Sequence, residues 1–168
     1  NKHTNICLNV ILDHSRHLLN RLHDNSIDVC FSYLATNEIS YKCIPYKTDE
    51  IVFVTNSQNI QFSNGIHNGE MLHLPIIYSK FMPKSGFDWI HDIFPPHYVF
   101  PFTISVIKEI IPFLLQYPYY AFLPRKLIEK ELEDGLLIEV PLLDYHIPPL
   151  QSYIIMKSNA KYNPLDYF

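Results

Sequence analysis

The chain opens with two short apolar runs separated by a helical segment, and this order restricts the fold more than any other feature. Residues 6–12 (ICLNVIL) and 27–31 (IDVCF) are nearly continuous in apolar side chains, as in strands that are covered on both faces. Between them, Asp13, His14 and Ser15 offer helix N-cap chemistry, and three leucines follow at helical spacing. A strand, a helix and a second strand in this order predict a βαβ unit with a parallel sheet.

The same alternation continues along the rest of the chain. Apolar runs predict further strands at residues 41–46, 50–55, 74–78, 98–102, 119–123, 136–140 and 153–157. Helices are predicted at residues 87–94, from Thr103 or Ser105 to Leu114, from Pro124 to Glu133, and from Asn163 onwards. Pro112 should kink or end the second of these, Asp134-Gly135 should end the third, and residues 57–70 are expected to form a loop. The predicted fold class is therefore α/β.

The amino-acid composition limits the classes of molecule that this chain is expected to bind. With 48% hydrophobic and 18% charged residues, the 168-residue chain can bury a sizeable core. Its 13 Lys and Arg are scattered and the net charge is −4, whereas a surface that binds nucleic acid needs clustered basic side chains. We therefore expect no direct contact with DNA. The most apolar stretch, residues 103–124, contains charges and prolines, and no signal-peptide core follows the N-terminus, so we expect neither a membrane span nor export.

The three cysteines fit a cytoplasmic protein. Cys7, Cys30 and Cys43 are odd in number and form no Cys-x-x-Cys motif. Cys7 and Cys30 lie in apolar runs, where a thiol behaves as a small hydrophobic group. We expect all three to be reduced and structural, as is usual in the cytoplasm.

Three segments together resemble the effector-binding domain of LysR-type transcription regulators. Residues 6–31 are similar to the family's strand, acidic-Ser turn, leucine helix and second strand with an Asp. Residues 43–54 are similar to the family's passage into its second lobe. Residues 105–140 carry a helix, a strand ending in Leu123-Pro124, a second helix and a Gly-Leu-Leu sequence from Gly135. The order and spacing of these segments cover nearly the whole chain.

The resemblance implies a type 2 periplasmic-binding-protein-like fold, with two Rossmann-like lobes around a central cleft. Residues 1–47 plus 125–168 would form the first lobe and residues 48–124 the second, joined by two crossover strands. A small-molecule effector in the cleft would control DNA binding by a separate helix-turn-helix domain, which is not in this chain. The family's first strand and helix and its last helix are also missing. We therefore expect a trimmed fragment, although a degenerate natural protein would look the same.

The resemblance also implies assembly as homodimers or homotetramers. The helices at residues 15–24 and 105–114 would lie at the interface between subunits, although their apolar stripes are equally consistent with packing in the core. The sequence departs from the family where Tyr117-Pro118-Tyr119 replaces a Gly-x-Gly. Bulky rings at this position would change one wall of the cleft.

Candidate effector-binding residues follow the predicted strands. Ligands of open α/β sheets bind at the carboxyl ends of strands and at helix N-termini, which are the places that the family uses. The residues at these positions are Ser15, Ser32 and Tyr33 in the first lobe and Ser79, Lys80, Phe102 and Thr103 in the second. A lysine beside a serine suits a carboxylate or another anion. Plainer roles remain open: Ser15 as an N-cap, Tyr33 as a packing residue and Lys80 as a solvated loop residue.

The sequence does not predict an enzyme, a cofactor or a metal site. His14, His17 and Asp13 could share one helix face, but two histidines on a surface turn do not complete a metal site. The chain has no nucleophile elbow, dinucleotide-binding glycine motif or phosphate-binding loop. Two alternatives stay open: a free solute-binding protein of the same fold, and an enzyme on a similar two-lobe scaffold, such as a dehydratase of aromatic amino-acid synthesis.

Overall fold

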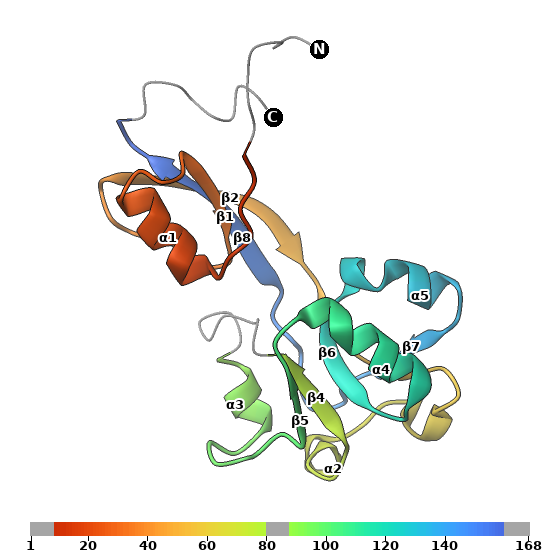
Figure 1. Cartoon of the computed structure of the whole chain (residues 1–168). Helices are drawn as coiled ribbons and strands as arrows, with labels where there is room; N and C mark the ends of the chain where they lie inside the picture. Colours follow the sequence, from red (N-terminus) through yellow and green to blue (C-terminus); the bar gives the residue numbers. More distant parts are fainter. Residues whose placement is uncertain (1–8, 80–87, 160–168) are drawn as a thin grey trace. The chain divides into compact units, whose positions relative to one another are not determined.

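The computed structural model describes residues 9–79 and 88–159, and the chain divides into two compact units (Figure 1). Unit 1 consists of Asn1–Lys47 and Gln151–Phe168, and unit 2 consists of Thr48–Leu150. The predicted first lobe also included residues 125–150, which here belong to unit 2. The physical reason is strand pairing, because residues 137–139 form hydrogen bonds with a central strand of unit 2.

Unit 1 is a three-stranded sheet with one helix. Helix α1 (Ser15–His23) leads to strand β1 (Val29–Ser32), and the sheet is completed by β2 (Tyr41–Asp49) and β8 (Leu150–Lys157) in the order β1-β8-β2. Leu22 of α1 packs with Cys30 of β1 and Ile155 of β8, and Leu18 and Leu19 pack against this cluster. The leucine stripe of α1 therefore forms the core of unit 1.

The expected parallel βαβ unit is not what the described residues form. In the strand predicted at residues 6–12, residues 6–8 lie outside the described part of the chain, and residues 9–12 have no regular secondary structure. Strand β1 pairs antiparallel with β8, from Val29 opposite Met156 to Ser32 opposite Tyr153. This pairing joins residues far apart in sequence, so the local apolar pattern could not predict its direction.

Unit 2 is built on a mixed five-stranded sheet. Its strands are β3 (Ile51–Asn56), β4 (Ile76–Ser79), β5 (Phe102–Ile104), β6 (Tyr120–Pro124) and β7 (Leu137–Glu139), in the order β5-β4-β6-β3-β7. Strand β4 is parallel to both β5 and β6, whereas β3 is antiparallel to both β6 and β7.

The helical segments of unit 2 are short. They are η1 (Ile60–Phe62), α2 (Asn68–Met71), α3 (Ile90–Ile93), η3 (Ile107–Glu109), α4 (Ile110–Gln116), η4 (Arg125–Leu127) and α5 (Glu129–Glu133). The loop expected at residues 57–70 thus contains two single turns, and Pro124 ends a strand instead of opening a helix. Residue 87 and the helix expected from Asn163 lie outside the described residues.

Pro112 lies in the first turn of α4, where a backbone N–H has no partner within the helix and proline is tolerated. The turn before it is a 3₁₀ turn, η3, rather than a continuous α-helix. The expected disturbance by Pro112 is therefore a change of helix type upstream of the proline.

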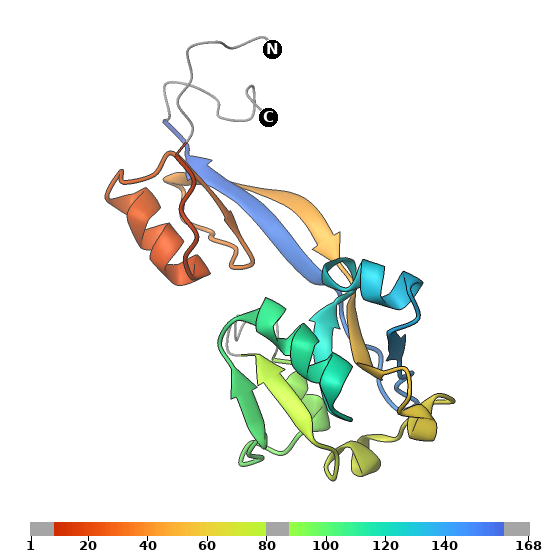
Figure 2. The ribbon, with the colours of Figure 1, turned by 45° about the vertical axis from the view of Figure 1, so that its right-hand side comes forward.

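Two apolar layers cover the sheet of unit 2. On one face, Ile110 and Leu114 of α4 pack against side chains of β3, β4 and β6, and Figures 1 and 2 show α4 lying along this face. Elsewhere the packing is aromatic, with the ring centroid of Phe53 4.7 Å from Phe122 and 5.4 Å from Tyr120. Trp89 extends this cluster, with its ring 5.1 Å from Phe122. Unit 2 therefore has a larger described core than unit 1.

Candidate functional site

The structure brings the candidate residues of unit 1 together. Ser15 is the first residue of α1, and Ser32 and Tyr33 lie at the carboxyl end of β1. The backbone N–H of Tyr33 donates a hydrogen bond to Ser15 Oγ over 3.4 Å. The N-cap position of α1 is His14, which makes no side-chain capping bond, so the plainer interpretation of Ser15 as the N-cap is wrong. Its hydroxyl instead joins the helix to the end of the strand.

Ser32 has a different environment from Ser15. It is almost fully buried, its hydroxyl donates to the carbonyl oxygen of Leu34 over 3.0 Å, and it accepts the N–H of Leu34 over 2.9 Å. These two bonds close a tight turn after β1. The turn fixes the loop on which Tyr33 stands, so Ser32 shapes this end of the strand.

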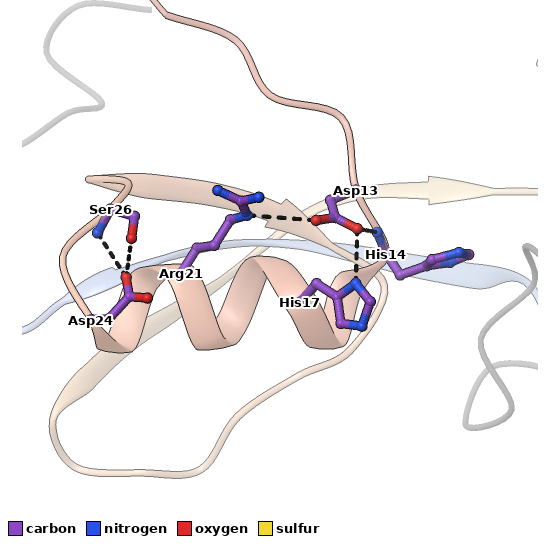
Figure 3. Close-up of polar contacts among 6 residues, drawn as sticks. All are labelled: Asp13, His14, His17, Arg21, Asp24 and Ser26. Atoms are coloured by element: carbon purple, nitrogen blue, oxygen red, sulfur yellow. Dashed lines mark hydrogen bonds and ion pairs between the residues drawn. The ribbon is translucent and has the colours of Figure 1, made fainter.

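A charged cluster lies beside Ser15 at the start of α1 (Figure 3). Asp13 Oδ1 accepts the N–H of His14 over 2.8 Å and lies 2.9 Å from His17 Nδ1, and Asp13 Oδ2 lies 3.5 Å from Arg21 Nε. The hydrogen bond from His17, followed by that from the His14 N–H, lowers the pKa of Asp13. A carboxylate therefore already neutralises part of the positive end of this helix.

Of the two histidine rings near this carboxylate, that of His17 faces it and that of His14 points away. Figure 3 shows the ring of His14 turned away from the Asp13 carboxylate, and it meets the ring of His17 edge to face at 5.9 Å. Within residues 9–79 and 88–159, no group of three or more His, Cys, Asp or Glu is placed to hold a metal ion.

In unit 2, two candidate residues lie on neighbouring strands. Ser79 is the buried last residue of β4, and Thr103 lies in β5, which runs parallel beside it. Tyr78 is opposite Thr103 and Ser79 is opposite Ile104, so Ser79 and Thr103 are offset by one residue and their side chains face opposite sides of the sheet. Lys80 lies outside the described residues. The structure thus brings the strands of Ser79 and Thr103 side by side but does not bring their side chains onto one face.

Thr103 does not precede a helix, contrary to expectation. It is an exposed residue inside β5, and neither Thr103 nor Ser105 caps the helical segment, which starts only at Ile107. The run Phe-Thr-Ile has high β-propensity and finds a pairing partner in β4, which outweighs the capping signal. Thr103 can therefore offer a hydroxyl group but not a helix N-terminus.

Phe102 belongs to a row of aromatic rings on the surface of unit 2. Its ring lies 4.6 Å from Tyr119, which lies 5.6 Å from Tyr117, which in turn lies 6.4 Å from Phe113. The row includes both tyrosines that replace the expected glycines, and about 44% of Phe113 and 49% of Tyr117 is exposed. Phe113 was not among the predicted residues, although its i, i+4 spacing with Tyr117 would place both side chains on one face of a helix.

The described cysteines are free. Cys30 is buried and Cys43 is half-buried, whereas Cys7 lies outside the described residues. Burial, with a smaller contribution from Cys43, raises the pKa of the Cys30 thiol to about 11. A thiol of this kind stays protonated at neutral pH and is a poor nucleophile. No helix in the described part of the chain is long and apolar enough to cross a membrane.

Comparison with protein families and comparison with solved structures give the same classification. Residues 1–165 match the family described as the LysR substrate binding domain, and the chain belongs to this family. It therefore has the mixed α/β, type 2 periplasmic-binding-protein-like fold of LysR effector-binding domains. No curated protein sequence matches the chain.

Solved structures of LysR-type regulators have a similar fold. The regulatory domain of HypT from Salmonella typhimurium in its apo-form is 16% identical over 98% of this chain and 80% of that chain, with a TM-score of 0.74. ArgP from Mycobacterium tuberculosis is 14% identical over 99% of this chain and 57% of that chain, with a TM-score of 0.73. The OxyR C206 mutant from Corynebacterium glutamicum is 19% identical over 89% of this chain, with a TM-score of 0.65, and this chain spans 48% of its length.

Proposed function

We propose that this domain binds a small-molecule effector and couples that binding to DNA recognition by a helix-turn-helix domain outside this chain. Membership of the LysR family supports the proposal, together with the structural likeness to the regulators HypT, ArgP and OxyR. Such a regulator would work in the cytoplasm. The coupling would be an allosteric one between two separate sites, in which the effector favours one arrangement of the regulator over another.

The observation that carries this proposal is the contact between Ser15 and Tyr33. Their hydrogen bond joins the first turn of α1 to the carboxyl end of β1, where ligands of α/β sheets bind. In unit 2, Ser79 and Thr103 lie on neighbouring parallel strands, and Phe102 directly precedes Thr103. We propose these residues and Lys80 as effector contacts, with Ser32 holding the Tyr33 loop. The lysine next to Ser79 favours a carboxylate or another anion.

We propose that the domain binds its effector and does not catalyse a reaction of it. Ser15 accepts its hydrogen bond from a backbone N–H, and Ser32 bonds with the backbone of Leu34. A nucleophilic serine needs a basic side chain that takes its proton. Because these two hydroxyls contact main-chain groups instead, they are suited to hold a ligand rather than to attack it.

We also propose that the domain forms a homodimer through the α4 side of unit 2. The leucines of α1 are used in the core of unit 1, and its outward residues, such as Arg16 and Asn20, are polar. Helix α4 buries Ile110 and Leu114 and still presents exposed Phe113 and Leu115. A second apolar face of this kind is typical of a subunit interface.

A thermal-shift screen of small carboxylates, amino acids and phosphorylated metabolites tests the sensing proposal. A ligand that binds only the folded state raises the melting temperature. At a ligand concentration of about 100 times Kd, it adds about 2.7 kcal/mol to the free energy of unfolding. We expect the shift to be lost in Ser15→Ala and in Thr103→Val. It should persist in the control Ser63→Ala, which removes an exposed hydroxyl of unit 2 outside the candidate set.

Two outcomes would contradict the proposal. One is that no compound in the screen changes the melting temperature of the wild-type chain. The other is a hit whose shift is unchanged in both Ser15→Ala and Thr103→Val, because the ligand would then bind elsewhere on the molecule.

A further inference from the structure

Unit 2 contains a cavity of about 320 Å³ that includes none of the candidate effector residues. It lies between the first half of β3 and residues 139–149. The sheet order β5-β4-β6-β3-β7 places this cavity at the opposite edge of the sheet from Ser79 and Thr103. The two places on unit 2 are thus separated by the width of the sheet.

The sequence explains why the cavity exists. Strand β7 pairs with β3 only as far as Glu139 opposite Val54, and one further bond joins the N–H of Val140 to the carbonyl oxygen of Phe53 over 2.8 Å. Pro141, Pro148 and Pro149 follow, and proline has no N–H to donate to a strand ladder. Because pairing cannot continue, the chain leaves β3 and a hollow remains beside it.

The floor of the cavity is apolar and one wall is firmly held. Ile51, Phe53 and Val140 are buried, and Phe53 is anchored in the aromatic core of unit 2. Tyr145 forms part of the wall, and its hydroxyl donates to Asp92 Oδ2 over 2.7 Å. This hydrogen bond raises the pKa of Tyr145 to about 12, so the phenol stays protonated and in place at neutral pH.

The polar groups of the cavity leave a surplus of negative charge. Glu50 and Glu139 both line it, and the single guanidinium of Arg125 serves both: it contacts Glu139, and its Nε lies 3.7 Å from Glu50 Oε2. His146 is a further lining residue, and Asp92 lies behind Tyr145. Two carboxylates against one guanidinium leave one negative charge at the rim that a ligand cation would balance.

We propose that this cavity binds a small organic cation, in which an ammonium group is joined to an aromatic or branched aliphatic body. The apolar body would lie on Ile51, Phe53 and Ile147, and the ammonium group would pair with Glu50, whose carboxylate is the more distant of the two from Arg125. The volume is at the lower end of the range for small-molecule sites, about 300–1,000 Å³. This site is independent of the proposed effector residues and would be a second ligand site on the same unit.

The only tryptophan of the chain reports on this cavity. Trp89 packs on Tyr145 with ring centroids 6.3 Å apart, so a ligand that touches Tyr145 should change its fluorescence. Three probes share one body and differ in charge: 2-phenylethylamine, 2-phenylethanol and phenylacetate. We expect a saturable change with the amine at millimolar concentration, a weaker one with the alcohol and none with phenylacetate.

Single substitutions distinguish amine binding in the cavity from effector binding at the proposed effector residues. Glu50→Gln is the safer substitution, because about 66% of the Glu50 side chain is exposed and folding should be unaffected. It should weaken amine binding about fivefold, as expected for a partly exposed ion pair. Glu139→Gln should act in the same direction, whereas the control Glu133→Gln on α5 should have no effect. Thr103→Val should leave amine binding unchanged even if effector binding is lost.

The proposal is overturned if the amine gives no saturable change, or if phenylacetate binds as well as the amine. Equal amine affinity in wild type, Glu50→Gln and Glu139→Gln would also overturn it, provided that melting temperatures show all three chains folded. Since the readout is Trp89 and the probes are amines, failure here leaves the effector-sensing proposal to be judged by its own screen.

Discussion

The two units use the same kinds of element but differ in how much core supports them. In unit 1, one described cluster consists of Leu22, Cys30 and Ile155 with half-buried neighbours, and Ile154 and Met156 of β8 are also buried. In unit 2, nine buried residues form one cluster under α4 and α5, and a separate group of aromatic rings adds to it. Sheets of three strands with one helix are near the lower limit for independent stability. The comparison indicates that unit 2 is the more stable part of the domain.

Core truncation is the strongest test of this difference. Leu114→Ala should cost about 4 kcal/mol, because Leu114 is fully buried among side chains that cannot fill the gap. Leu22→Ala should cost about 2 kcal/mol, since its half-buried neighbours can move inward. The control Leu143→Ala, at an exposed position, should cost less than about 1 kcal/mol. Urea unfolding followed by circular dichroism gives all three values.

The fluorescence of Trp89 adds a second signal to this measurement, because Trp89 is the only tryptophan of the chain and lies in unit 2. If the units unfold separately, Leu22→Ala should shift the circular dichroism curve and leave the fluorescence midpoint unchanged. A larger cost for Leu22→Ala than for Leu114→Ala would mean that unit 1 is supported by more than its described core.

The outer faces of α1 and α4 give the next largest expected effect. If α4 forms the proposed dimer interface, Phe113→Ser should weaken self-association about tenfold or more, as for an aromatic residue at the centre of an interface. Asn20→Ala on the polar face of α1 should change it little. Sedimentation velocity over a range of concentrations distinguishes these cases. A monomeric wild type, or dissociation by Asn20→Ala alone, would refute the assignment to α4.

The helix ends offer a smaller and more local comparison. Two residues after the end of α1 lies Asn25 with φ 65°, and two residues after the end of α5 lies Gly135 with φ 67°. The N–H groups of Ser26 and Leu136 donate to the carbonyl oxygens of Arg21 and Glu131, which is the outer hydrogen bond of a Schellman motif at both ends.

Substitutions at these two positions should therefore differ. Gly135→Ala should cost about 1 kcal/mol through backbone strain alone, since no atom lies within 4 Å of the new Cβ. Asn25→Gly relieves a similar strain but removes the hydrogen bond from Lys157 Nζ to Asn25 Oδ1, of 2.6 Å. We expect a net change within about 0.5 kcal/mol for Asn25→Gly. A large loss in Asn25→Gly would show that the Lys157 bond outweighs the strain.

Each unit also contains a His–Asp pair, and substitutions in these pairs should give the smallest effects. In unit 1, His17 and Asp13 are four residues apart on one helix, whereas in unit 2, His67 Nδ1 lies 2.8 Å from Asp144 Oδ1 across 77 positions. The hydrogen bond with Asp144 raises the pKa of His67, and the same bond lowers the pKa of Asp144.

The sign of the pH dependence follows from these shifts. The stabilisation from His67 is complete below its ordinary pKa of 6.5 and is lost as pH rises through its raised value. The stabilisation from Asp144 and Asp13 is present above pH 3.8, their ordinary pKa. It is lost as the pH falls through their lowered pKa values. His67→Asn should therefore lower the melting temperature more at about pH 5.5 than at about pH 8.5. The control His73→Asn should show no such difference, and an equal effect of His67→Asn at both pH values would contradict the assignment.

Much of the fold follows from local sequence. The positions of α1, β2, β3 and β6 were predicted to within a few residues because each is a short run with its own periodicity and end signals. The ends of the helices near Asp24 and Asp134 were also predicted from the sequence. The residues that follow, Asn25 and Gly135, are of the two types that most readily adopt the left-handed conformation found after a helix. Ser15, Ser32 and Tyr33 were each predicted as effector-binding residues, and their binding of an effector stays a prediction.

Only the tertiary structure decided which strands pair and what lies between them. It placed residues 125–150 in unit 2, gave β1 an antiparallel partner and put Thr103 in a strand instead of at a helix start. The His67–Asp144 pair and the cavity beside β3 also join residues that no short sequence window contains. The physical reason is the range of the interactions: capping and periodicity act within one or two turns, whereas strand pairing and cavity formation depend on partners that meet only when the chain has folded.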